Sequence, residues 1–176
     1  MWAMRKQQQA CFWTAEEIDL ADDKQHLLSL RAPELSFLFA ALAFFAVSDK
    51  VVADNLSHNF MSEVTSPEAQ CFYAAQTHME NVHQETYGLM LETHILDQKI
   101  KQGCFAAAEA APSVRAKVEW AKQFCDPARA SFAERLVAFA VVEGALFSGA
   151  LCAIFWFKQR GLMPGLCFAN ELISRA

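Results

Sequence analysis

Apolar residues recur at helical spacing along almost the whole chain, and glycine is scarce before its last third. Apolar positions three and four residues apart are typical of amphipathic and buried α-helices. Runs of β-branched residues are short, so little in the pattern favours strands. The sequence therefore predicts an all-α protein, organised as a single helical domain over residues 1–176.

Start and stop signals divide this pattern into separate helices. Thr14 and Glu17 form a capping box, Pro67 follows an N-cap serine, and Gly161 stands where a glycine C-cap belongs. These signals predict helices over about 14–22, 33–64, 66–95, 106–111, 114–124 and 130–160, a turn at 164–165, and a last helix from 168 onward.

The segment 79–87 carries the strongest chemical signal. Glu80 and His83 are three residues apart and Tyr87 follows His83 by four, so on a helix all three lie within about 60° of one another. A carboxylate and an imidazole at this spacing form half of a di-metal site in a helical bundle. The same spacing also suits a solvated helix face, so the metal interpretation needs matching carboxylates from neighbouring helices.

Two single carboxylates in apolar surroundings could supply that match. Asp49 follows an apolar run, and Glu143 is the one charge in the apolar segment 136–157. A buried carboxylate needs a cation, hydrogen bonds or a proton. The residues alone leave two alternatives open: Asp49 on a solvated helix edge, and Glu143 as a protonated acid bonded to another helix.

Five blocks resemble, in order and at matching spacing, the small, radical-generating subunit of class I ribonucleotide reductase in its eukaryotic and viral form. They are FWTAEEIDL, LAFFAVSDKVVADNL, EAQCFYAAQTHMENVHQETYGLMLETHI, AERLVAFAVVEGALFSGALCAIFWFKQRGLMPGL and NELISR. The resemblance covers nearly all residues from about 11 to 175. It implies a ferritin-like helical bundle in a cytoplasmic protein.

The resemblance also implies a role for each candidate residue. Asp49 would be the terminal carboxylate ligand of the first iron, His83 its histidine ligand and Glu80 the bridging carboxylate. Glu143 would bind the second iron. Tyr87 would store the stable radical, although its alternative is a core tyrosine with a satisfied hydroxyl.

Four further residues gain roles from the same resemblance. Trp13 would relay an electron between the metal site and the partner subunit, although a packing residue or staple is the simpler alternative. Phe147 and Ile173 would wall a dry pocket around the radical. Leu151 stands where the family has a phenylalanine, and ordinary core packing fits Phe147 and Leu151 equally well.

One motif of the complete site is missing. The family continues NELISR with Asp-Glu-x-x-His, whereas this sequence stops at Ala176. Two Glu-x-x-His motifs and two single carboxylates make a full site. We therefore expect a bundle that is incomplete at its C-terminus, from a truncated or partial product. It should bind metal weakly and be inactive alone.

The implied function is that of a ribonucleoside-diphosphate reductase small subunit. A di-iron centre and dioxygen would generate a tyrosyl radical for deoxyribonucleotide synthesis on a large subunit, and the small subunits would form a homodimer. The sequence does not distinguish iron from manganese. The alternative is a catalytically incomplete fragment or paralogue that associates with intact small subunits.

The composition of the chain limits which partners it could bind and where in the cell it could be located. The net charge of −5 argues against nucleic acid. Six cysteines without a C-x-x-C pair favour reduced thiols in a cytosolic core. No apolar stretch of a signal peptide follows the polar, basic first ten residues.

Segment 136–157 is long enough to span a bilayer. The family resemblance and the absence of a second span of that length favour a buried bundle helix, and no membrane partner.

Overall fold

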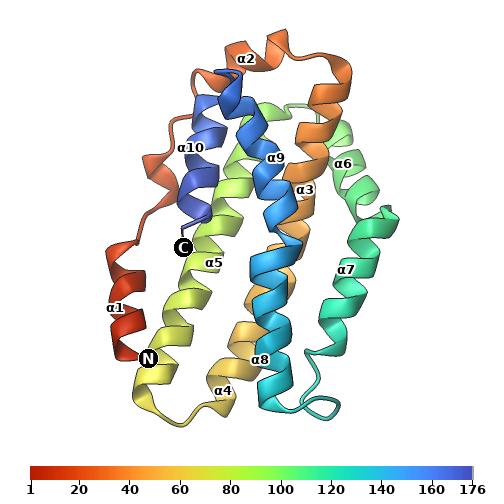
Figure 1. Cartoon of the computed structure of the whole chain (residues 1–176). Helices are drawn as coiled ribbons and strands as arrows, with labels where there is room; N and C mark the ends of the chain where they lie inside the picture. Colours follow the sequence, from red (N-terminus) through yellow and green to blue (C-terminus); the bar gives the residue numbers. More distant parts are fainter. Residues whose placement is uncertain (176) are drawn as a thin grey trace.

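The computed structural model describes residues 1–175, which form an elongated helical bundle (Figure 1). The protein is 81% helical, and the described residues contain no strand. The all-α prediction is therefore confirmed. The helices are α1 (Trp2–Ala10), α2 (Asp23–Ser29), α3 (Ala32–Asn55), α4 (Met61–Glu63), α5 (Pro67–His94), α6 (Gln98–Ala110), α7 (Pro112–Gln123), α8 (Phe132–Val141), α9 (Ser148–Gln159) and α10 (Pro164–Ile173). A 3₁₀ turn, η1 (Ala15–Glu17), and two π-helical turns, η2 (Leu56–Phe60) and η3 (Val142–Leu146), complete the path.

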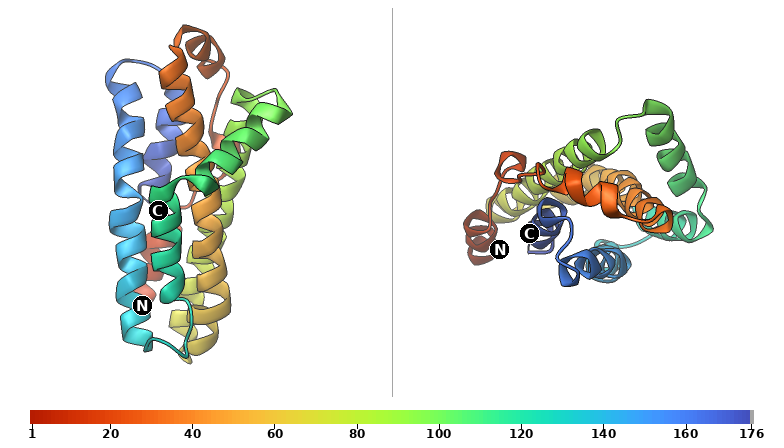
Figure 2. Two further views of the ribbon diagram at one scale, coloured as in Figure 1. Left: turned by 90° about the vertical axis from the view of Figure 1, so that its right-hand side faces the viewer. Right: turned by 90° about the horizontal axis from the view of Figure 1, so that it is seen from above.

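Helices α3 and α5 pack against each other at the centre of the bundle. Helix α1 lies along α5, α6 and α7 lie against α3, and α10 packs on α9, as the view down the bundle shows (Figure 2). The largest fully buried apolar side chains include Leu38, Phe45, Phe60 and Phe157. Their burial removes apolar surface of α3 and of the 132–159 segment from water, which is the main driving force for such packing.

The predicted helix limits hold where capping chemistry sets them. Glu17 Oε1 accepts a hydrogen bond from the Thr14 amide at 3.0 Å, which is one arm of the capping box. Gly161 adopts a φ of +65°, and the next amide, of Leu162, donates to the Phe157 carbonyl at 3.0 Å. This is the glycine-terminated helix end that the sequence predicts.

Several predictions about the helices were wrong. The helix predicted over 14–22 is only the 3₁₀ turn η1, α2 was not predicted, and α6 begins at Gln98 and not at 106. The first ten residues form α1, which the sequence analysis did not anticipate, and the last helix begins at Pro164 and not at 168. Asp23 explains the early start of α10. Its fully buried carboxylate accepts hydrogen bonds from the amides of Gly165, at 2.9 Å, and Leu166, at 2.8 Å. A side chain distant in sequence thus caps α10 and extends it by one turn.

Gly165 also lies against backbone, which makes it sensitive to substitution. A Cβ at this position would lie 2.3 Å from the Asp19 carbonyl oxygen. We expect Gly165→Ala to lower the free energy of unfolding by about 1–3 kcal/mol, the usual cost of overpacking. Urea denaturation followed by circular dichroism measures the change. The matched control is Gly149→Ala in α9, where nothing lies within 4 Å of the new Cβ. This control should be neutral or stabilising, and equal losses in both variants would contradict the steric account.

Two helices are long and apolar enough to cross a membrane, and the sequence analysis anticipated one. Residues 32–63 form the second, with a mean hydropathy of 1.9, and half of that window is buried. Residues 132–159 have a mean hydropathy of 2.0, but only 22% of their most apolar stretch is buried. The helix that the sequence analysis expected to be buried is therefore only partly buried in this chain. One face packs on the core and the other, including Val137 and Trp156, is exposed.

Candidate metal centre

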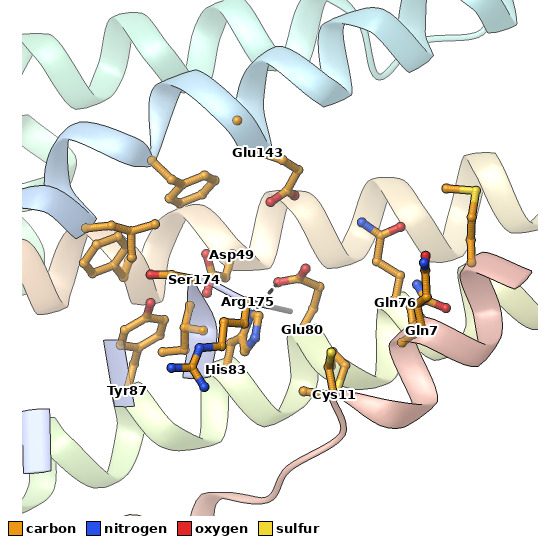
Figure 3. A pocket seen from close by; sticks show the side chains of 18 of the residues that line it. Gln7, Cys11, Asp49, Gln76, Glu80, His83, Tyr87, Glu143, Ser174 and Arg175 are labelled. Atoms are coloured by element: carbon orange, nitrogen blue, oxygen red, sulfur yellow. Dashed lines mark hydrogen bonds and ion pairs between the residues drawn. The ribbon is translucent and has the colours of Figure 1, made fainter. Parts of the chain in front are cut away.

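Three elements bring four carboxylate and imidazole side chains to one cavity. Asp49 comes from α3, Glu80 and His83 come from α5, and Glu143 comes from η3. One ligand atom from each of Asp49, Glu80 and His83 lies within 4.8 Å of the others, and all three residues are buried. Figure 3 shows the Glu143 carboxylate directed toward the same group. The Glu-x-x-His spacing thus faces the interior, and the single carboxylates come from facing helices.

Glu143 owes its direction to a local change of helix type. It lies in the π-helical turn η3, which interrupts the otherwise continuous helix of α8 and α9. Single π-turns inside α-helices are rare and occur often at functional sites. The start of this helix is fixed by Arg135, a buried side chain whose Nη1 donates to Glu63 Oε1 at 2.7 Å.

The cluster is electrostatically strained without a cation. Burial raises the pKa of Asp49 well above its usual value, and the nearby carboxylates of Glu80 and Glu143 raise it further. Burial, and then the charge of Glu80, raises the pKa of Glu143 to about 8. Asp49 and Glu143 therefore hold protons in this dry site that they would lose in water. A bound cation would remove this penalty.

The hydrogen-bonding state of the cluster fits a metal. His83 Nδ1 lies 3.3 Å from Glu80 Oε2, whereas His83 Nε2 and Glu143 Oε1 are buried without a hydrogen-bond partner. Buried polar atoms without partners are uncommon, and a bound ion is one standard explanation for them. Carboxylate oxygens and imidazole nitrogen suit iron and manganese. The residues present therefore fit a metal pair, with fewer ligands on the Glu143 side.

Tyr87 lies in the same cavity, one turn beyond His83. Its side chain is 3% exposed. Burial raises its pKa well above 10, and the charges of Asp49, Glu80 and Glu143 add to the effect. The phenol is therefore neutral and shielded from water at physiological pH.

Aromatic rings enclose this phenol. Phe45 of α3 stacks on Tyr87 with ring centroids 5.1 Å apart, and Phe147 lies 6.2 Å from Phe45. Phe147, Leu151 and Ile173 all line the cavity, as the sequence analysis expected. Phe45 was missed. Its signal was present in the sequence, because Phe45 precedes Asp49 by one helical turn and so shares its face.

Trp13 lies against the imidazole ring of His83. The indole is 2% exposed and stacks on the imidazole with centroids 5.7 Å apart. Its Nε1–H is buried without a hydrogen-bond partner in the described residues. A tryptophan used only for packing usually places this group on an acceptor. Trp13 is thus buried against a residue of the cluster, and its role in electron relay stays a prediction.

The cavity that holds these groups has a volume of about 520 Å³. One wall is formed by α1, through Gln7 and Cys11, and another by Ile173 and the two residues that follow it. Figure 3 shows the polar side chains of Gln7 and Gln76 at the end away from Tyr87. The four remaining histidines lie outside the cavity. Among them, His94 is buried, with its Nε2 3.5 Å from Asp23 Oδ2.

Fold and cavity together define a class: ferritin-like helical bundles with a carboxylate and histidine cluster between their helices. The chain belongs to the family described as "Ribonucleotide reductase, small chain", whose sequence model matches residues 1–176. It is 50% identical over 175 residues to the human ribonucleoside-diphosphate reductase subunit M2, covering 99% of this chain and 45% of that protein. The tobacco small chain is 52% identical, with 99% and 53% covered. The chain thus spans about half the length of these relatives.

Solved structures agree with this assignment. The Rnr4 homodimer of Saccharomyces cerevisiae ribonucleotide reductase matches with a TM-score of 0.87 and 34% identity, covering 99% of this chain and 56% of that one. The dimanganese(II) NrdF of Streptococcus sanguinis matches with a TM-score of 0.85 and 15% identity, with 98% and 60% covered, and so supports the fold alone. The predicted family and the predicted ferritin-like fold are both confirmed.

Proposed function

We propose that this chain is the radical-generating part of a ribonucleoside-diphosphate reductase small subunit. One observation carries the proposal. Asp49, Glu80 and His83 hold their ligand atoms within 4.8 Å, in the cavity that also contains the buried phenol of Tyr87. Radical chemistry of this kind needs an oxidisable side chain that is close to a redox metal and shielded from reductants, and the cavity holds a buried phenol beside side chains that could bind such a metal.

In this proposal Asp49, Glu80 and His83 hold the first metal ion, and Glu80 and Glu143 reach the second. When bound, the metal pair supplies the electrons that reduce dioxygen and, in turn, the oxidising power that removes an electron from Tyr87. Iron is the proposed metal. Manganese fits the same donors.

The protein side chains have distinct tasks around this chemistry. Tyr87 gives up its hydroxyl proton together with an electron, since a neutral radical is less costly in a dry site than a charged one. Phe45, Phe147 and Ile173 exclude water from the ring. The stacking of Trp13 on His83 gives a short path for an electron between the surface and the cluster.

The proposed partners follow from the family. A large subunit would use the radical to make deoxyribonucleotides, and small subunits would pair, as in the Rnr4 homodimer. Small subunits of this family are soluble enzymes, and we propose a cytoplasmic location. Nucleic acid and membrane are not among the proposed partners.

A second candidate function is supported by the exposed apolar face of α8 and α9. Val137 is 65% exposed and Trp156 is 41% exposed. An exposed apolar helix face favours association with another protein. A catalytically incomplete form that binds intact small subunits would bury this face. Metal binding distinguishes the two candidates, because only the first needs a working cluster.

The isolated 176-residue chain is expected to bind Mn²⁺ weakly, with at most one tightly bound ion per chain, because three of the four ligand groups serve one ion and a second ion has only Glu80 and Glu143. His83→Ala should weaken binding by at least about tenfold, since even residues that merely orient a ligand have effects of that size. Anaerobic calorimetric titration measures both quantities. The matched control is His78→Ala, on the exposed face of the same helix, which should bind normally. Two tightly bound ions, or equal losses in both variants, would contradict the proposed ligand set.

A further inference from the structure

The π-helical turn that carries Glu143 leaves a backbone carbonyl without its helical donor. In a regular α-helix the amide of Ala150 would donate to the Leu146 carbonyl. Here the amides of Ala150 and Leu151 both donate to Phe147, at 3.0 and 3.1 Å. The Leu146 carbonyl is therefore released at the junction of η3 and α9. Such a group costs free energy in a half-buried position unless another donor reaches it.

Lys117 supplies that donor from a different helix. Its Nζ, projecting from α7, donates to the Leu146 carbonyl at 2.8 Å. The ammonium also lies 4.9 Å from the centroid of the Phe44 ring in α3, in cation–π range. Lys117 thus joins α7, α3 and the π-turn. The adjacent carbonyl, of Ala145, accepts from the Ser148 hydroxyl at 2.9 Å within the same helix.

The contact selects one of two helix forms. If residues 142–151 were regular α-helix, the Leu146 carbonyl would already accept from an amide, and the Lys117 ammonium would have to share it. The hydrogen bond to Lys117 is therefore stronger in the wide turn, where it replaces the missing amide. A π-turn inserts one extra residue into the helix and rotates the side chains on its two sides by about 100° relative to each other. The turn thereby sets how Glu143 and Phe147 face the cavity.

We propose that Lys117 is a positioning residue for the metal centre: by holding the π-turn, it aims Glu143 at Asp49 and Glu80. This inference rests on the proposed function, because it concerns a ligand of the same cluster. Lys117 itself touches neither the cluster nor Tyr87. It acts through the backbone, from the far side of the helix.

A double-mutant cycle on the full chain tests the proposal, with Mn²⁺ as the probe. Lys117→Met should weaken Mn²⁺ binding about tenfold at the weaker site, which Glu80 and Glu143 serve, as loss of supporting residues around a metal does, and should leave the site of Asp49, Glu80 and His83 unchanged. In the Glu143→Gln background the same substitution should change affinity less than about twofold, because the ligand it positions is already lost. Lys117→Arg keeps a donor and should restore most of the affinity. Lys122→Met, on the exposed side of α7, is the matched control.

A measurement that needs no metal distinguishes failure of the Lys117 proposal from failure of the proposed function. Amide hydrogen exchange of residues 142–151 should quicken about tenfold in Lys117→Met, the effect of one charge-assisted hydrogen bond, and stay unchanged in Lys122→Met. Equal loss of Mn²⁺ affinity with and without Glu143, or unchanged exchange in this segment, overturns the proposal. If the unaltered chain binds no Mn²⁺ at all, the proposed function fails, and the exchange result still decides whether Lys117 holds the turn.

Discussion

A chain continued past Arg175 with the Asp-Glu-x-x-His helix and remainder of its family is expected to form a tyrosyl radical after addition of ferrous iron and dioxygen. The added glutamate and histidine would complete the ligands of the second iron. Reduction of dioxygen then has two adjacent metals, and Tyr87 lies in their cavity. Electron paramagnetic resonance detects the radical. The 176-residue chain should give no signal.

Two tyrosine variants make this result specific. Tyr87→Phe in the extended chain should abolish the signal. Tyr73→Phe is the matched control, because Tyr73 is buried on the same helix but stacks on Phe60 outside the cavity. A signal that persists unchanged in Tyr87→Phe, or that vanishes in Tyr73→Phe, would move the radical away from Tyr87.

The metal-free chain is expected to lose stability as the pH rises from about 4.5 to about 8. The pKa of Glu143 is raised from 4.5 to about 8 in the folded protein, so in this range the folded chain holds a proton that the unfolded chain has released. The stability that Glu143 contributes is fully present below pH 4.5 and is lost as the pH approaches the pKa of about 8 that Glu143 has in the folded protein. At about 1.4 kcal/mol per pKa unit the loss is on the order of a few kcal/mol, and Asp49 adds to it in the same direction.

Urea unfolding in the presence of a chelator, repeated across this pH range, measures the effect. Glu143→Gln should flatten the dependence, because an amide cannot titrate. Glu109→Gln, on an exposed surface of α6, should leave the dependence unchanged. A stability that increases between pH 4.5 and 8 and is insensitive to Glu143→Gln would contradict the buried, uncompensated cluster.

Sequence reasoning predicted the helices whose limits depend on local signals. The capping box at Thr14, Pro67 and Gly161 all mark helix ends that the structure contains. The Glu-x-x-His spacing also placed Glu80, His83 and Tyr87 on one helix face, since side-chain direction on a helix follows directly from residue number. The structure shows that this face is interior, which the spacing left open.

The features that were missed depend on contacts between distant parts of the chain. The early start of α10 follows from Asp23, 142 residues away from the amide of Gly165. The π-turn at Glu143 is held by Lys117 of another helix. Helix α1 has a polar sequence with no buried residue and packs on α5, so its pattern alone did not predict it. Tertiary contacts of this kind leave no local signal in a single sequence.

Anomalous diffraction from crystals of the chain soaked in Mn²⁺ tests the central claim most directly. The account predicts a manganese peak in the cavity between α3 and α5, within about 2 Å of ligand atoms from Asp49, Glu80 and His83. Any weaker second peak should lie between Glu80 and Glu143. Peaks confined to surface carboxylates, with the cavity empty at saturating Mn²⁺, would contradict the assignment of this cluster as a metal centre.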